Sequence, residues 1–270
     1  MNSKKVLPES LICLIGPPRS GTTLIANAVA SHSKVTGILE PYQRGRDQEY
    51  NETNLEALVK QNEVTDLDAK PHLAMKETTT RTANANLTVE LLQSAANYEV
   101  YTGLILIFRC PFIAYLSQVS ASQKYWREKK LVEDTENAIA TWAKAQMAAL
   151  RILTLHARAH HFRLVSYEQF CLKPASELAR LMALIPENVQ KHQLQFRPPK
   201  DIKGAADPKV REKSGAIIQT DYTDQVNSLR ERYRDLKCMD FMMRYRELVL
   251  EHVGKESDLK TLDRLTRLVA

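Results

Sequence analysis

The stretch LICLIGPPRSGTT, residues 11–23, joins an unbroken apolar run to a loop that contains Gly16 and Gly21. A short apolar run that ends at glycine and proline is typical of a strand buried on both faces of a parallel sheet. After the loop, apolar residues recur at helical spacing as far as His32, and the polar Thr22 can begin the helix. The stretch therefore predicts a strand, a tight loop and a helix in direct succession.

The same alternation of strands and helices continues along the chain. Apolar runs predict strands over residues 35–39, 73–75, 103–108 and 162–165, and periodicity predicts helices over 85–97, 111–128, 132–160 and beyond residue 174. From about residue 223 onward only helices are predicted. This alternation predicts an α/β fold with a mainly parallel, doubly wound sheet, helices on both faces and a helical C-terminal region. No repeat or linker divides the chain, so residues 1–270 are predicted to form one domain.

The composition limits the class of partner. The chain carries 38 Lys and Arg against 32 Asp and Glu, a net charge of +6, but the basic residues are spread along its length. A nucleic-acid surface needs a concentrated basic patch, so no nucleic-acid partner is expected. No apolar run is long enough for a signal-peptide core or a membrane helix, so we expect a cytoplasmic location and no membrane span. The four cysteines lack metal-ligand spacing, and reduced thiols without a metal site are expected.

The loop between the first strand and the first helix has the glycine frame of a phosphate-binding P-loop. Gly16 and Gly21 stand five residues apart, and backbone N–H groups at the following helix N-terminus can bind an anion. Nucleotide-triphosphate enzymes place lysine where this chain has Thr22, and the nearest cation, Arg19, comes three residues earlier. The shifted cation predicts an anion other than a nucleoside triphosphate.

The segment GPPRSGTTL, residues 16–24, resembles the 5′-phosphosulfate loop of the PAPS-dependent sulfotransferases. PAPS is 3′-phosphoadenosine 5′-phosphosulfate, and the PRSGTT variant is that of tyrosylprotein and bacterial sulfotransferases. The resemblance implies a P-loop α/β fold, PAPS as the donor and adenosine 3′,5′-bisphosphate as the product. It also implies that Arg19 lies beside the phosphosulfate and that the residues Ser20, Gly21, Thr22 and Thr23 hold the 5′-phosphate.

A second anchor is predicted at the end of the strand over residues 103–108. Arg109 ends this strand and Ser117 follows eight residues later, where a helix should have begun. A guanidinium fork and a hydroxyl can donate to the same phosphate. The spacing resembles the 3′-phosphate element of the sulfotransferases.

Four further residues are assigned by this resemblance. Lys76 directly follows the predicted strand over residues 73–75. It resembles the lysine that points toward the bridging oxygen of the donor, although Glu77 follows it and the usual proline is absent. Tyr167 is expected near the nucleotide. Lys209 and Lys213 lie in a stretch similar to the late loop that closes over the donor.

The reaction needs a base to remove the proton of the acceptor hydroxyl. Glu40 lies 21 residues after Arg19, the interval that separates loop arginine and catalytic glutamate in the tyrosylprotein-type enzymes that the chain resembles. The cytosolic small-molecule branch uses histidine, and His72 is the alternative here. The resulting hypothesis is an in-line displacement in which Glu40 takes the proton while Arg19 and Lys76 stabilise the departing phosphate, with no metal.

Two other functions stay open at this point. The glycine frame is shared with P-loop nucleotide and small-molecule kinases, although the missing lysine and the Arg109–Ser117 pair argue against them. The chain could also bind an adenosine bisphosphate or a partner without chemistry. The acceptor is expected to be a carbohydrate or another small or secondary metabolite, with a lipid or peptidic tyrosine as alternatives, and the sequence leaves the oligomeric state open.

Overall fold

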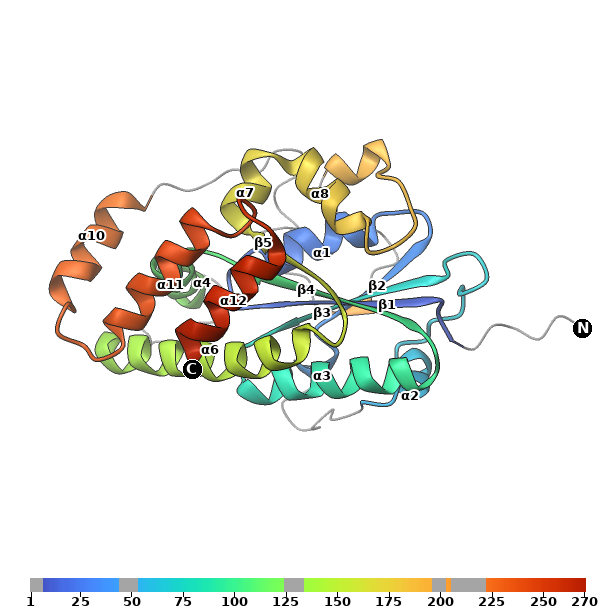
Figure 1. Cartoon of the computed structure of the whole chain (residues 1–270), viewed down its shortest axis with the longest axis horizontal. Coiled ribbons are helices and arrows are strands. Elements are labelled where there is room, and N and C mark those ends of the chain that lie inside the picture. The colour runs from blue at the N-terminus through green and yellow to red at the C-terminus, as the bar shows by residue number, and fades with distance from the viewer. Residues whose placement is uncertain (1–6, 44–52, 124–133, 196–202, 205–221) are drawn as a thin grey trace, which may run out of the picture.

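The centre of the molecule is a six-stranded parallel sheet (Figure 1). The computed structural model describes residues 7–43, 53–123, 134–195, 203–204 and 222–270. The strands are β1 (Ser10–Gly16), β2 (Val35–Leu39), β3 (His72–Thr78), β4 (Tyr101–Phe108), β5 (His161–Ser166) and β6 (Lys203–Gly204). Their order across the sheet is β5-β4-β1-β3-β2-β6, and every paired neighbour is parallel.

Helices connect the strands and complete the chain. They are α1 (Thr22–Ala30), α2 (Leu55–Gln61), α3 (Thr82–Asn97), α4 (Pro111–Ala121), α6 (Thr135–Ala157), α7 (Tyr167–Leu172), α8 (Pro174–Met182), α10 (Thr223–Arg232), α11 (Met239–Glu251) and α12 (Asp258–Val269), with the short 3-10 turns η1 (Pro41–Gln43) and η3 (Lys191–Gln195). The predicted α/β fold, with a parallel sheet between helices and a helical C-terminal region, is confirmed.

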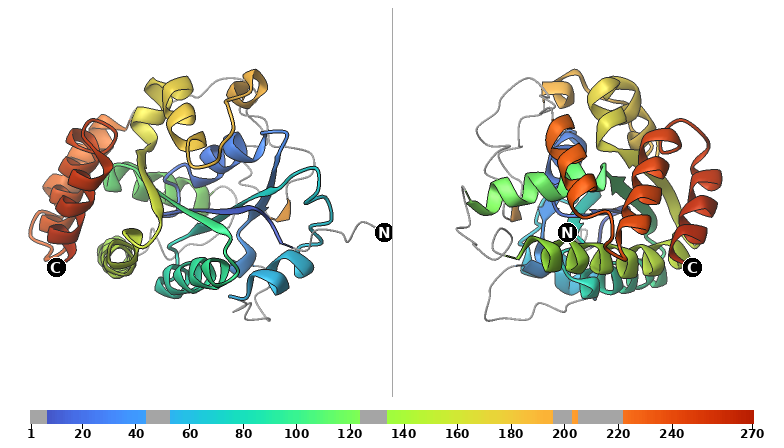
Figure 2. Two further views of the ribbon diagram at one scale, coloured as in Figure 1. Left: turned by 45° about the vertical axis from the view of Figure 1, so that its right-hand side comes forward. Right: turned by 90° about the vertical axis from the view of Figure 1, so that its left-hand side faces the viewer.

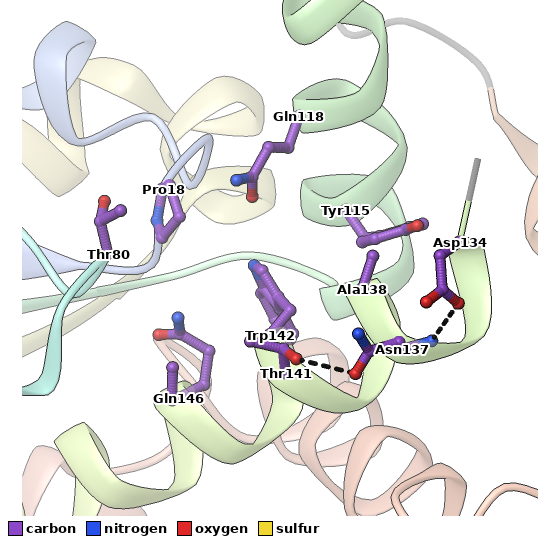
Figure 3. Close-up of a pocket in the computed structure, with 11 residues that line it drawn as sticks. Pro18, Thr80, Tyr115, Gln118, Asp134, Asn137, Ala138, Thr141, Trp142 and Gln146 are labelled. Atoms are coloured by element: carbon purple, nitrogen blue, oxygen red, sulfur yellow. Dashed lines mark hydrogen bonds between the residues drawn. The ribbon is translucent and has the colours of Figure 1, made fainter. Parts of the chain in front are cut away.

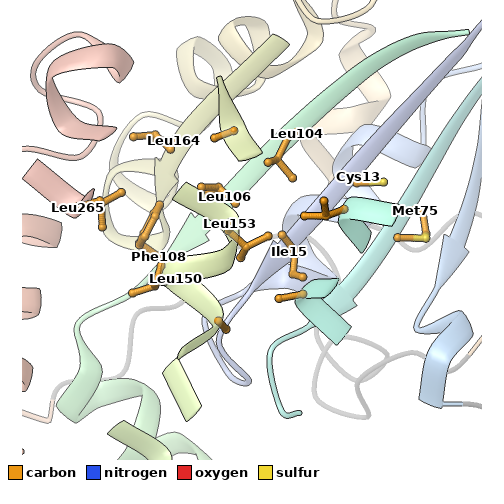
Figure 4. Packing of buried hydrophobic residues seen from close by; sticks show 14 of the residues in the cluster. Cys13, Ile15, Met75, Leu104, Leu106, Phe108, Leu150, Leu153, Leu164 and Leu265 are labelled. Atoms are coloured by element: carbon orange, nitrogen blue, oxygen red, sulfur yellow. The ribbon is translucent and has the colours of Figure 1, made fainter. Parts of the chain in front are cut away.

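The helices form two layers, one on each face of the sheet (Figures 1 and 2). Helices α1, α7 and α8 cover one face, while α3 and α6 cover the other, with α11 and α12 packed beside α6 and β5. Each face has its own apolar cluster. Figure 4 shows the larger one, in which Leu106 and Phe108 of β4 pack against Leu150 and Leu153 of α6 and Leu265 of α12. One continuous core thus joins the first strand to the last helix.

The strand order creates a crevice at the carboxyl edge of the sheet. From the central strand β1 the chain adds β2 and β3 on one side and then β4 and β5 on the other. Where the loops after two neighbouring strands run in opposite directions, a ligand-binding crevice forms between them. The loops that follow Gly16, Thr78 and Phe108 all begin at this edge, because Gly16 pairs with Thr78 and Ile15 with Leu106.

Some elements were not predicted from the sequence. The six-residue helix α7 is stabilised locally, since the hydroxyl of Ser166 accepts a hydrogen bond from the N–H of Gln169, and only Phe170 of this helix is buried. A helix with one buried residue has no apolar periodicity to detect. Helix α2 is also short, with seven residues. Within the described residues no helix is both long and apolar enough to cross a membrane, and the four cysteines are free thiols.

Candidate active site

The P-loop between β1 and α1 has a tightly constrained backbone. Arg19 and Gly21 have positive φ values of 66° and 85°, and Ser20 donates to the carbonyl of Pro17 from both its N–H at 3.1 Å and its hydroxyl at 2.6 Å. A Cβ atom on Gly21 would lie 2.2 Å from the ring of Tyr167. Glycine at this position is therefore required by both the backbone conformation and the neighbouring ring.

Helix α1 begins without a side-chain cap. Its N-cap residue, Gly21, has no side chain that could accept a hydrogen bond from the first turn, and that turn contains no acidic residue. Thr22 and Thr23, the first two residues of the helix, are buried. The first N–H groups of a helix lack intrahelical partners and carry partial positive charge, so this end can accept a phosphate.

Arg109 is a buried cation beside the P-loop. The residue is 8% exposed. Its guanidinium donates from Nη1 to the carbonyl of Arg19 at 2.8 Å and lies 4.3 Å from the centroid of the Tyr167 ring. Within the part of the chain that the structure describes, it forms no ion pair with a carboxylate, and its Nε has no hydrogen-bond partner. The buried carboxyl group of Glu168 is near enough to interact with this charge but forms no salt bridge with it. A buried cation without a salt-bridge partner favours binding of an anion.

Ser117 connects the second predicted anchor to the first. It lies on α4, and its hydroxyl accepts a hydrogen bond from Nε of Arg19 at 3.4 Å. The structure therefore brings Arg19, Gly21, Arg109, Ser117 and Tyr167 into one set of contacts, although they come from four separate segments of the chain.

Glu40 and Lys76 form a second group at the same edge of the sheet. Lys76 is 1% exposed and its ammonium group contacts the carboxylate of Glu40, which is 21% exposed. Glu40 follows β2 with a positive φ of 50°, and its N–H donates to the carbonyl of Lys76 at 2.7 Å. The end of β2 is thus tied to β3 through both backbone and side chain, and the carboxylate retains access to solvent.

Glu77 is a buried carboxyl group that the sequence interpretation treated as a variable loop position. It is 0% exposed and accepts hydrogen bonds from the N–H of Tyr42 at 3.1 Å and the N–H of Thr78 at 2.9 Å. Burial raises the pKa of Glu77 to about 7. Because Tyr42 lies two residues after Glu40, Glu77 fixes the turn that carries the predicted base. A glutamate next to a lysine in the second half of a buried strand was the available signal.

His72 lies far from these groups. It begins β3, pairs in register with Ser10 at the start of β1, and exchanges a hydrogen bond of 2.9 Å with the Ser10 hydroxyl. At about 3.3 Å per residue, a seven-residue strand places the two edges of the sheet about 20 Å apart. The geometry therefore argues against His72 as the base. Lys209 and Lys213 lie outside the described residues.

A pocket of about 390 Å³ opens beside the P-loop (Figure 3). Its lining comes from the loop, the residues after β3, and helices α4 and α6: Pro18, Thr80, Tyr115, Gln118, Asp134, Asn137, Ala138, Thr141, Trp142, Ala145 and Gln146. Trp142 lies within the helix predicted over residues 132–160, where an apolar residue is expected to be part of the core. A pocket at this place can hold a second substrate next to a phosphate-bound donor.

Comparison with solved structures identifies the fold. A sulfotransferase domain from the curacin biosynthetic pathway is similar over 97% of this chain and 98% of its own, with a TM-score of 0.55 and 16% identity. A sulfotransferase from Alicyclobacillus acidocaldarius is similar over 92% of this chain and 97% of its own, with a TM-score of 0.52 and 11% identity. No family model and no curated protein matches the sequence. The resemblance to sulfotransferases is thus confirmed at the level of the fold.

Proposed function

We propose that this chain is a sulfotransferase that moves the sulfuryl group of PAPS to a hydroxyl-bearing acceptor and acts as a single domain. The proposal rests chiefly on Arg109, a buried cation that forms no salt bridge with a carboxylate among the described residues and donates to the P-loop carbonyl of Arg19. The sulfotransferase fold and the uncapped start of α1 support it.

The donor has two ends for these groups to bind. In the proposal the 5′-phosphosulfate lies over the start of α1, at the residues Ser20 to Thr23 and beside Arg19, while Arg109 and Ser117 hold the 3′-phosphate. Support comes from the hydrogen bond between Arg19 and Ser117, which brings the two anchors side by side. Tyr167 supports the guanidinium of Arg109 through its ring face, a favourable arrangement for a cation.

The proposed reaction is an in-line displacement at sulfur. The acceptor oxygen forms a bond to sulfur as the bond between sulfur and the bridging phosphate oxygen breaks, and the acceptor proton passes to the carboxylate of Glu40. Negative charge then develops on the departing adenosine 3′,5′-bisphosphate. Arg19 and Lys76 stabilise that charge, since fixed cations at the leaving oxygen lower the barrier without a metal. The contact between Lys76 and Glu40 supports this division of roles.

A P-loop kinase is not favoured. Two solved structures that share this fold over nearly the whole chain are sulfotransferases. Thr22 occupies the place of the lysine that contacts the β- and γ-phosphates in nucleotide-triphosphate enzymes.

Calorimetric titration with adenosine 3′,5′-bisphosphate and with ATP and magnesium tests the donor assignment. Micromolar binding of the bisphosphate with no binding of ATP is expected, and a preference for ATP would contradict it. Transfer from PAPS to a mixed panel of phenols and sugars then tests catalysis. Glu40→Gln should bind the bisphosphate as the unmodified protein does but lose transfer by about 100-fold or more. Unchanged transfer in Glu40→Gln contradicts the assignment of the base.

A further inference from the structure

The pocket beside the P-loop contains two polar atoms without partners. The Oε1 atom of Gln118 and the Nε1 atom of Trp142 are buried and accept or donate no hydrogen bond among the described residues. Trp142 as a whole is 7% exposed. Figure 3 shows the Gln118 amide extending from α4 and the indole nitrogen of Trp142 pointing up toward it from α6. Buried polar groups are ordinarily paired, so an unmatched acceptor and donor that face one pocket indicate a ligand.

The other buried polar groups of the lining are already occupied. The Gln146 amide oxygen accepts from the hydroxyl of Thr79, and its nitrogen donates to the Thr79 carbonyl at 3.4 Å. The Tyr115 hydroxyl forms a hydrogen bond with Thr135. The buried unpaired atoms of the lining are therefore one acceptor and one donor, which a single hydroxyl group can satisfy by donating to Gln118 and accepting from Trp142.

The lining also limits the charge of the ligand. It contains no lysine or arginine, and its one carboxylate, Asp134, lies at the exposed mouth and caps α6 by accepting from the N–H of Asn137 at 3.2 Å. An acidic ligand would find no cation among these residues. Most of the remaining surface is ring or methyl, from Pro18, Tyr115, Ala138, Trp142 and Ala145.

We propose that this pocket binds the acceptor, and that the acceptor is a small, neutral, ring-bearing alcohol or phenol with a second hydroxyl that is read by Gln118 and Trp142. The inference rests on the proposed function, because the pocket is taken as the acceptor side of the same site. A saccharide is disfavoured, since most of the lining surface is apolar and would cover several of its hydroxyls without giving each a partner. The size of the pocket, about 390 Å³, is within the range of small-molecule sites, which run from about 300 to 1,000 Å³.

Matched naphthols test the inference. We would titrate 2,6-dihydroxynaphthalene, 2-naphthol, 6-hydroxy-2-naphthoate and glucose into the protein, with and without adenosine 3′,5′-bisphosphate. Because the diol has a second hydroxyl for Gln118 and Trp142, we expect it to bind about two- to ten-fold more tightly than 2-naphthol. The naphthoate and glucose should bind at least about ten-fold more weakly than the diol.

Two variants remove the partners of the second hydroxyl without emptying the pocket. In Trp142→Phe and in Gln118→Leu, the preference for the diol over 2-naphthol should fall toward one, while 2-naphthol itself binds about as before. Gln93→Leu makes the same change on the exposed surface of α3 and should keep the preference. Thermal unfolding of each variant separates a loss of recognition from a loss of folding.

The outcomes distinguish the two proposals. The pocket assignment is overturned if neither naphthol binds, if both pocket variants keep the preference for the diol, or if glucose or the naphthoate binds as tightly as the diol. Binding of the bisphosphate with no such preference leaves the donor site intact and rejects the acceptor class alone. Diol recognition without bisphosphate binding supports the pocket and rejects the sulfotransferase function.

Discussion

The buried carboxyl group of Glu77 predicts an unusual pH dependence of stability. Burial raises its pKa in the folded protein from an ordinary value of 4.5 to about 7. Between these two pH values the folded state holds a proton that the unfolded state has lost. The contribution of Glu77 to the free energy of unfolding is therefore complete below pH 4.5, falls as the pH rises toward 7, and is constant above it. A difference of about 2.5 pH units corresponds to about 3 kcal/mol.

The substitution Glu77→Gln isolates this effect. Glutamine resembles the protonated carboxyl group in shape and neutrality, and it keeps an oxygen for the N–H of Tyr42 or Thr78. It does not titrate. The free energy of unfolding of the variant minus that of the unmodified protein should therefore increase by about 3 kcal/mol as the pH rises from 4.5 to 8.

Urea unfolding at several pH values across this range measures the difference. Glu90→Gln, on the exposed surface of α3, is the matched control and should show no such change with pH. If the difference between Glu77→Gln and the unmodified protein stays constant within about 1 kcal/mol, Glu77 binds no extra proton in the folded state and its pKa is not raised.

Three further substitutions test the donor site. Gly21→Ala combines a strained φ with a Cβ atom 2.2 Å from the ring of Tyr167. Calorimetry should therefore show that the variant binds the bisphosphate at least about ten-fold more weakly, and unchanged binding would contradict the role of the P-loop backbone in holding the donor. Lys76→Met should reduce transfer from PAPS by about 100-fold in a turnover assay but leave bisphosphate binding within about three-fold, and equal loss of both would argue for a structural role. Ser117→Ala should weaken bisphosphate binding by about two- to ten-fold, with the midpoint of thermal unfolding as its control.

The order of strands and helices was predictable because it depends on local apolar patterns. Residues 11–15 are apolar without interruption, and they form most of β1, which is buried on both faces. The helices over residues 85–97 and 132–160 were predicted with small errors at their ends, since α3 and α6 each have a broad apolar face. The whole order of strands across the sheet, in contrast, depends on contacts between distant segments and could not be read from one sequence.

The site was predictable only in part, for a related reason. The P-loop is a contiguous segment, so its glycines and Arg19 could be recognised together, and the spacing of Arg109 and Ser117 is short. The role of Glu77 depends on the N–H of Tyr42, which lies 35 residues away in the chain. The unpaired nitrogen of Trp142 is visible only when its neighbours are known, because a tryptophan on an apolar helix face is ordinarily part of the core.

The preference for adenosine 3′,5′-bisphosphate over AMP tests the central claim most directly, because the two ligands differ only in the 3′-phosphate that Arg109 is proposed to bind. Calorimetry should show the bisphosphate binding about 10- to 100-fold more tightly than AMP, as expected for one or two charge-assisted hydrogen bonds. Arg109→Ala should reduce that preference to about three-fold or less, whereas Arg158→Ala, at an exposed ion pair, should keep it. A preference that survives in Arg109→Ala, or that is absent from the unmodified protein, would contradict the account.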